Sequence, residues 1–203
     1  MLISPMLNVA YSDTLSGFKQ MYINTRGIRI EGTIGNKVSY ITDFYENQAY
    51  LLGAENEFAL KYMVVPGQGA SKTFNKNGHD FAAASGRINL KPTDWLNVSV
   101  GNGKHFVGQG YRSILLSDNA FNYPFLRTDL HLGKLTYTAM LMRYEEFYHK
   151  YYAQHIRKHS TMLHLSYLPN PRFEIVLFEN IIWETSDTLQ TNQMQAAMLV
   201  PLP

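Results

Sequence analysis

The sequence contains no cysteine and few charges of either sign. Without cysteine, the 203-residue chain has no disulfide, zinc–thiolate site, iron–sulfur cluster or thiol nucleophile. Lys and Arg number 18 against 16 Asp and Glu, a net charge of +2 with no basic cluster, which argues against a nucleic-acid partner. Hydrophobic residues make up 45%, so the chain can bury a core and is not intrinsically disordered.

Long apolar runs are absent as well. Nowhere do 18 apolar residues follow one another, which excludes a transmembrane helix, and the first residues, MLISPM, lack the basic and apolar regions of a signal peptide. Charged residues make up only 17%, while 14 tyrosines contribute to 13% aromatics. Membrane-spanning β-strands need only about 9–11 residues of alternating polarity. Composition therefore leaves two classes, a soluble all-β domain and an outer-membrane β-barrel.

What the sequence does contain is a hydrophobic period of two. Residues 28–34 alternate, Gly35 and Asn36 interrupt the pattern, and 37–47 resume it, so residues 20–47 are predicted to form a hairpin. Further alternating segments occupy 87–91, 95–101, 135–139, 161–168 and 173–183. Turns that contain proline join 87–91 to 95–101 and 161–168 to 173–183. Short turns alternate with longer polar segments, 66–80 and 144–159, as in outer-membrane barrels.

This pattern predicts an all-β fold, an antiparallel meander of about ten strands. We expect one domain over residues 1–203, with the strands in 1–184 and an irregular tail in 185–203. The polar positions of the strands carry mostly Thr, Ser, Asn, His and Gly, which suits a hydrated lumen. Aromatic residues gather near the predicted strand ends, as in interfacial girdles, although Tyr and Trp also favour strands in general. Periodicity alone leaves the barrel and the soluble β-domain both open.

Familiar catalytic and metal motifs fail on inspection. Residues 67–73 have Ser71 where a phosphate-binding loop requires glycine. His155 and His159 have helical spacing, but no HExxH glutamate accompanies them. A glycan hydrolase would need two carboxylates in one cleft, for example Asp118 with Asp129 or Glu179, and no spacing supports this. We therefore predict no catalytic residue, no metal and no cofactor.

One segment, residues 101–127, is dense in glycine, amide and aromatic residues. Its glycines permit sharp bends, and its polar and aromatic side chains suit hydrogen bonding and stacking with a polar polymer such as a glycan. The candidate polysaccharide-binding residues are Lys104, Tyr111, Arg112, Asp118, Asn119 and Tyr123. The alternative is an inward-folded loop whose polar groups pair with one another and with the wall.

Four stretches also carry a family resemblance: GNGKHFVGQGYRSILLSDNAFNYPFLR at 101–127, INTRGIRIEG at 23–32, DFYENQA at 43–49 and FEIVLFENIIWE at 173–184. With them the chain resembles outer-membrane proteins of Bacteroidota of the capsule-assembly Wzi-like type, including the gliding-motility RemB-like type. The resemblance implies an outer-membrane barrel without catalysis that attaches or assembles surface polysaccharide, or that serves gliding motility. Its partners would be capsular or other surface polysaccharide and outer-membrane lipid.

The chain departs from this family in length. It is shorter than such barrels and lacks their signal peptide, so we expect it to represent part of a barrel, open and incomplete. Two other functions stay open: a porin-like channel for small solutes, suggested by the Thr, Ser, Asn and His of the second strand face, and a soluble β-domain acting as a glycan-active enzyme.

Overall fold

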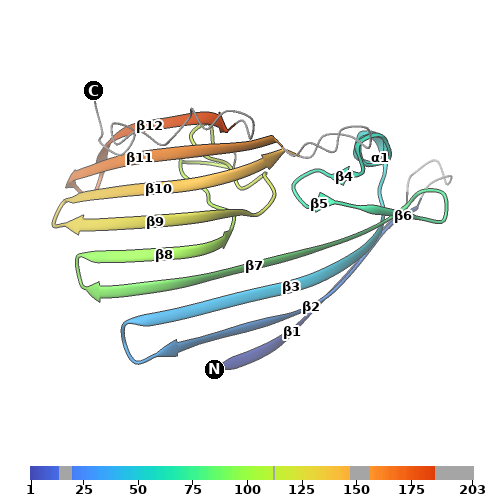
Figure 1. Ribbon diagram of the computed structural model, residues 1–203, viewed down its shortest axis with the longest axis horizontal. Coiled ribbons are helices and arrows are strands. Elements are labelled where there is room, and N and C mark those ends of the chain that lie inside the picture. The colour runs from blue at the N-terminus through green and yellow to red at the C-terminus, as the bar shows by residue number, and fades with distance from the viewer. Residues whose placement is uncertain (14–19, 112, 147–155, 186–203) are drawn as a thin grey trace.

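Nine strands follow one another through one antiparallel sheet (Figure 1). The computed structural model describes residues 1–13, 20–111, 113–146 and 156–185. The nine strands are β1 (Leu2–Asp13), β2 (Gln20–Ile34), β3 (Val38–Tyr50), β7 (Gly78–Thr93), β8 (Leu96–Gly103), β9 (Tyr123–Leu132), β10 (Leu135–Glu146), β11 (Ile156–Asn170) and β12 (Phe173–Thr185). The predicted all-β antiparallel meander is therefore confirmed.

The connection between β3 and β7 departs from the prediction of a polar loop over 66–80. It contains a helix, α1 (Gly53–Tyr62), then β4 (Val64–Val65), β5 (Gly69–Ala70) and β6 (Lys72–Phe74). β4 pairs with β5, and β6 joins the main sheet as a tenth strand by pairing with the first residues of β7, which β8 does not reach. No helix of the described part of the chain is long and apolar enough to cross a membrane.

Four hairpin turns lie at one end of the sheet, on the left in Figure 1. They span residues 35–37, 94–95, 133–134 and 171–172. Gly35 and Gly133 both have a φ of 62°, a conformation that tight turns require and that glycine adopts without strain. The connections at the opposite end include the much longer segments 51–77 and 104–122. The predicted asymmetry between short turns and long connections is confirmed for these segments.

The remaining parts of the predicted layout are only partly described. In the predicted polar segment 144–159, residues 144–146 continue β10 and 156–159 begin β11, while 147–155 lie outside the described residues. The predicted tail, apart from Thr185 at the end of β12, lies outside them too.

The sheet stays open. Within the described part of the chain, β1 pairs only with β2 and β12 only with β11. Eight of the nine strands have 10 residues or more, and β8 has 8. Three of the four prolines inside the strands lie where a missing N–H is tolerated: Pro5 is on the edge strand β1, and Pro92 and Pro169 are at register shifts. The fourth, Pro124, is the second residue of β9.

The strand register divides the side chains between two faces. Because pairing is antiparallel throughout and side chains alternate, each face can be followed from β1 to β12. We call the face against which α1 and residues 104–122 pack the inner face, and the opposite one the outer face. The packing follows from two buried clusters, one joining Ala59 of α1 to Phe81 and the other joining Leu116 to Met140.

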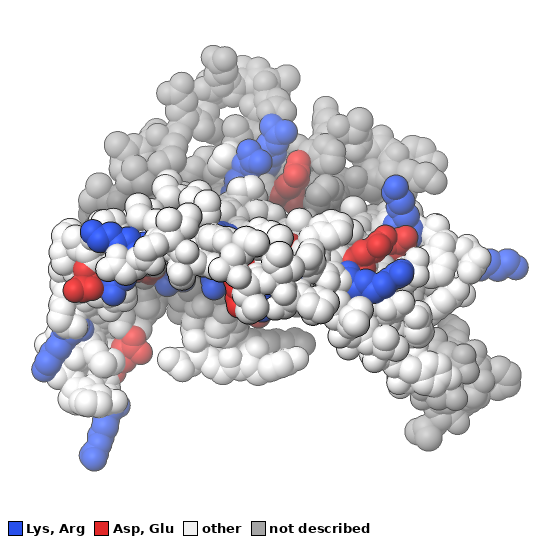
Figure 2. Space-filling view, turned by 90° about the horizontal axis from the view of Figure 1, so that it is seen from below, with Lys and Arg blue, Asp and Glu red and all other residues white. Residues whose placement is uncertain are grey.

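The outer face is apolar over its middle, and many of its large side chains are exposed. Its exposed large side chains include Ile3, Leu7, Val9, Ile28, Phe44, Ile88, Leu90, Val100, Leu126 and Leu177. Outer-face Tyr and Trp residues lie near both strand ends: Tyr40, Tyr137 and Tyr167 towards the hairpin turns, and Tyr11, Tyr22, Tyr50 and Trp183 towards the other end. Figure 2 views the molecule from below Figure 1, from the edge of the sheet where β1 lies, and on that side charged side chains are scattered and do not form a patch of one sign.

Candidate functional site

Residues 104–122 fold into a closed loop between β8 and β9. Val107 and Leu116 form an isolated antiparallel bridge, with N–H···O distances of 2.9 and 3.3 Å. The Ser113 hydroxyl donates to the Val107 carbonyl and accepts the amide of Leu115 at 3.0 Å. The glycine-rich sequence therefore builds a compact element held by its own backbone, within the segment 101–127 that was predicted as an inward or loop segment.

Apolar contacts fix this loop to the inner face. Val107, Leu116 and Ala120 pack against a cluster that contains Met140 and Met162, both 0% exposed. Full burial of one such side chain contributes about 1.5–3 kcal/mol, so the loop is anchored by several kcal/mol before any polar contact is counted. The loop is thus part of the fold, not an appended surface segment.

A second connection, residues 66–71, interlocks with the loop. The Lys104 ammonium donates to the Gly67 carbonyl at 2.6 Å, although the two residues lie far apart in sequence. The Phe121 ring occupies the place where a side chain at position 69 would lie, at 2.6 Å from a Cβ built there. Only glycine fits at this position, which also has a φ of 106°. Two of the long connections are therefore joined on the same side of the sheet.

The structure separates the six candidate binding residues into different environments. Lys104 is half-buried and bonded, Asp118 and Asn119 are exposed, and Tyr111 is 91% exposed. Tyr123 is only 2% exposed, and its hydroxyl accepts the His105 amide at 3.1 Å, so its ring contributes to the core. Arg112 lies outside the described residues. Lys104 and Asn119 come together around Gly67, whereas Tyr123 lies beneath the loop.

A hollow of about 430 Å³ opens beside the loop on the inner face. Its walls include Arg29 and Asp43, Arg87 of β7, and Lys104 and His105 of the loop. Arg29 and Asp43 form a two-pronged ion pair with N···O distances of 2.6 and 2.9 Å. Within the described part of the chain, the Arg87 side chain has no hydrogen-bond or ion-pair partner.

The electrostatics of the hollow are those of a partly buried cationic site. Burial lowers the pKa of Lys104, and the charge of Asp118 opposes this effect. The pKa of His105 falls to about 4, first because the ring is buried and then because Arg127 and Arg87 repel a second positive charge. His105 is therefore neutral near pH 7, and the positive charge of the hollow comes from its arginines and lysine.

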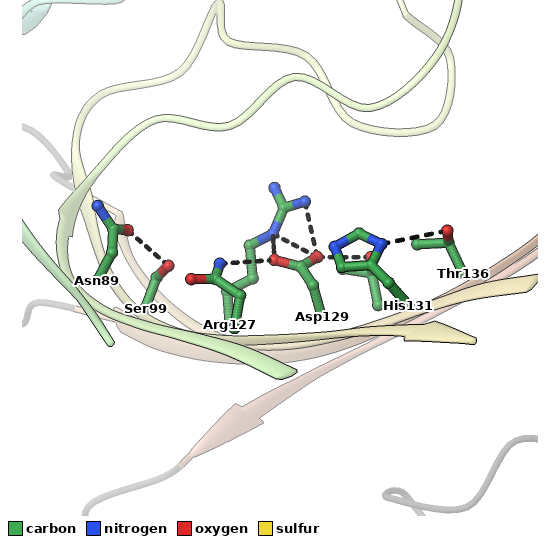
Figure 3. A network of polar contacts seen from close by, with 8 residues as sticks. Asn89, Ser99, Arg127, Asp129, His131 and Thr136 are labelled. Carbon is green, nitrogen blue, oxygen red and sulfur yellow. Dashed lines mark hydrogen bonds and ion pairs between the residues drawn. The ribbon is translucent and has the colours of Figure 1, made fainter. Parts of the chain in front are cut away.

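A row of polar side chains continues along the inner face towards the hairpin turns (Figure 3). The buried Asp129 carboxylate accepts hydrogen bonds from Arg127 at 2.9 Å, Thr138 at 2.7 Å and Asn97 at 3.3 Å. Ser99 donates to Asn89 at 2.7 Å in the same row. Figure 3 shows these side chains projecting from the strands towards the side on which the loop between β8 and β9 passes.

The two carboxylates considered as possible partners of Asp118 in a hydrolase, Asp129 and Glu179, lie on opposite faces of the sheet. Asp129 lies on the inner face, whereas Glu179, opposite Leu163 in the register, lies on the outer face. Glu179 and Asp129 therefore project to opposite sides of the sheet. Among the residues described, no group of three or more His, Asp and Glu side chains is placed to hold a metal. His159 stacks on Trp183 with ring centroids 5.8 Å apart, and His155 lies outside the described residues.

Sequence reasoning missed Arg87, although a signal was present. Residues 87–91 alternate, so Arg87 and Asn89 were bound to share the face opposite Ile88 and Leu90. The alternation gave no indication that Lys104 and His105 would line the same hollow as Arg87.

Comparison with family models, with curated proteins and with solved structures found no match for this chain. The described residues therefore define a class by fold alone, an all-β protein built on a nine-stranded antiparallel meander.

Proposed function

We propose that this chain is part of the wall of an outer-membrane β-barrel and that its inner face contacts a surface polysaccharide. The observation that carries the proposal is the division of the sheet into two faces. Side chains such as Ile88 and Val100, each 53% exposed, belong to a broad apolar outer face, whereas ion pairs and hydroxyl–amide networks belong to the inner face. The inner face also holds the two buried apolar clusters, but a soluble sheet would turn a polar face to water where this one exposes an apolar band.

The aromatic residues support the same assignment. Outer-face Tyr and Trp side chains lie near the two ends of the strands, while the middle is dominated by Ile, Val and Leu. Such a band with an aromatic girdle at each edge matches the two interfaces of a bilayer. The strand lengths, mostly 10 residues or more, also suit a tilted crossing of the hydrocarbon core.

The polysaccharide part of the proposal rests on the inner face and on the resemblance of residues 101–127 to capsule-assembly proteins. The loop 104–122 and the connection 66–71 occupy part of the inner side, which favours a narrowed lumen with polar walls over a wide pore. We assign the chain a part in retaining surface polysaccharide or in gliding, without a catalytic step. A porin-like channel is the second candidate, favoured by the polar row that includes Asn89, Ser99 and Asp129.

The test uses the protein as its gene encodes it, in its host. Membranes are separated and washed with high salt and alkaline carbonate, and we expect the protein to stay in the outer-membrane fraction. Deletion of the gene is expected to reduce cell-bound polysaccharide or spreading on a surface, and expression from a plasmid to restore it. Recovery as a soluble periplasmic protein would overturn the proposal. Reconstituted protein that conducts ions steadily, with retention of polysaccharide unchanged in the deletion strain, would favour the channel.

A further inference from the structure

The hollow beside the loop has more positive than negative charge. Three cationic side chains, Arg29, Arg87 and Lys104, line it, and Asp43 is the only carboxylate among its lining residues in the described part of the chain. The Asp43 carboxylate is paired with the Arg29 guanidinium, and the Lys104 ammonium donates a hydrogen bond to the Gly67 carbonyl. Among the described residues, the N–H groups of the Arg87 guanidinium therefore have no partner and are available to a ligand on the inner face.

The walls around Arg87 provide room and varied chemistry. Tyr45 and Phe125 contribute aromatic rings, and Ser85 contributes a hydroxyl. Gly103 lines the hollow without a side chain, and the nearest atom to a Cβ built there is 3.8 Å away. A volume of about 430 Å³ is in the range of sites for small organic ligands and much larger than one inorganic anion requires.

We propose that this hollow binds an acidic sugar residue, with Arg87 holding the carboxylate. The planar guanidinium matches a carboxylate in a two-pronged geometry, as Arg29 already shows with Asp43. The ring of Tyr45 offers a face for the apolar side of a sugar ring, and Ser85 a hydrogen bond for a hydroxyl. This inference rests on the proposed function and narrows it, because it restricts the polysaccharide to one that contains uronic acid units.

The first experiment needs no variant. Purified full-length protein in detergent is titrated calorimetrically with a short oligogalacturonate and with the methyl ester of the same oligomer, which keeps the sugar rings and removes the charge. We expect the acid to bind at least about tenfold more tightly, the ratio expected from one charge-assisted contact at a partly exposed site. Equal binding of acid and ester, or no binding of either, would overturn the inference. Displacement of the acid by an equal concentration of inorganic sulfate would also overturn it, because the sugar would then add nothing.

The second experiment assigns the contact to one residue. Arg87→Gln is expected to weaken binding of the acid about tenfold and to leave the ester unaffected, whereas Arg172→Gln makes the same charge change in an exposed hairpin turn and should change neither. Arg87→Lys keeps the charge without the planar fork and should give an intermediate affinity. If Arg87→Gln fails to fold, Arg87→Lys decides, and wild-type affinity in a folded Arg87→Lys protein counts against the assignment.

The two proposals fail in different ways. A protein that stays in the outer membrane but binds acid and ester alike loses the acidic-sugar site and keeps the proposed location. If the protein is recovered as soluble and still prefers the acid in an Arg87-dependent manner, the acidic-sugar site is supported and the location in the membrane is refuted. The fractionation and the calorimetry are therefore carried out on the same preparations.

Discussion

An arginine placed on the outer face distinguishes lipid from water as the surroundings of this sheet. Ile88 lies opposite Tyr40 on β3 and Val100 on β8, and its side chain is 53% exposed. If lipid covers this face, Ile88→Arg loses about half the transfer free energy of an isoleucine side chain, about 1 kcal/mol. It also brings a guanidinium to the middle of the band, which costs about 2–4 kcal/mol. We expect folding into the bilayer to be destabilised by about 3–5 kcal/mol.

The same substitution has almost no cost in water, because exposed surface substitutions usually change stability by about 0.5 kcal/mol or less. The assay is urea-induced unfolding of full-length protein from lipid vesicles, followed by the fluorescence of Trp95 and Trp183. Thr93→Arg, at the exposed end of β7, serves as the matched control and should fold like the wild type. A free energy of unfolding for Ile88→Arg that equals the control value would refute the assignment of the outer face to lipid.

Three further substitutions test the inner face. Asp129→Asn should destabilise the fold by about 1.5–3 kcal/mol in the same urea assay, because charged hydrogen bonds at a buried position are lost, whereas Asp94→Asn at a fully exposed position should change it by less than about 0.5 kcal/mol. Gly101→Ala should cost about 1–3 kcal/mol, since the new Cβ would lie 2.7 Å from a Cα atom of β7, and Gly103→Ala should be tolerated; equal effects would contradict this packing. His105 has a pKa of about 4 in the folded protein against 6.5 ordinarily, so the unfolded chain binds more protons below pH 6.5. Stability should fall by up to about 3 kcal/mol between pH 6.5 and 4, and His105→Gln should flatten that part of the profile.

The strands with clean alternation and a turn residue between them could be predicted from the sequence alone. Gly35 lies in a turn that the structure contains, whereas the turn predicted around Pro92 falls at residues 94–95 and Pro92 itself belongs to β7. The alternation around these turns fixes which residues share a face. β1 was not among the alternating segments identified in the sequence, and Pro5 lies within it. Proline is tolerated there because β1 is an edge, which is a property of the whole sheet and not of the local sequence.

The candidate site was predictable as a segment but not as a set of contacts. Composition singled out residues 101–127, yet it did not separate the exposed Tyr111 from the buried Tyr123. That difference depends on where β9 begins, and β9 takes Tyr123 as its first residue. The bond from Lys104 to Gly67 joins segments that no periodicity connects, so local patterns contain no signal for it. Helix α1 was missed for a related reason, since its apolar residues do not follow a clear helical stripe and only Ala59 is buried.

The open edges link the fold to the proposal most tightly. β1 and β12 each leave one row of backbone N–H and C=O groups without a strand partner in the described sheet. In hydrocarbon each such group costs several kcal/mol, so the sheet suits lipid only if further strands pair with both edges. In water the edges are tolerable, but the apolar outer face, with Leu7 at 79% and Leu177 at 60% exposed, is then the liability. In lipid, the sheet therefore needs further strands paired with β1 and β12. In water, it needs another part of a protein to cover its apolar outer face. Residues such as Arg29, Asp43 and Asp129 pair on the inner face in either case, so the outer face and the edges, not the polar network, decide between them.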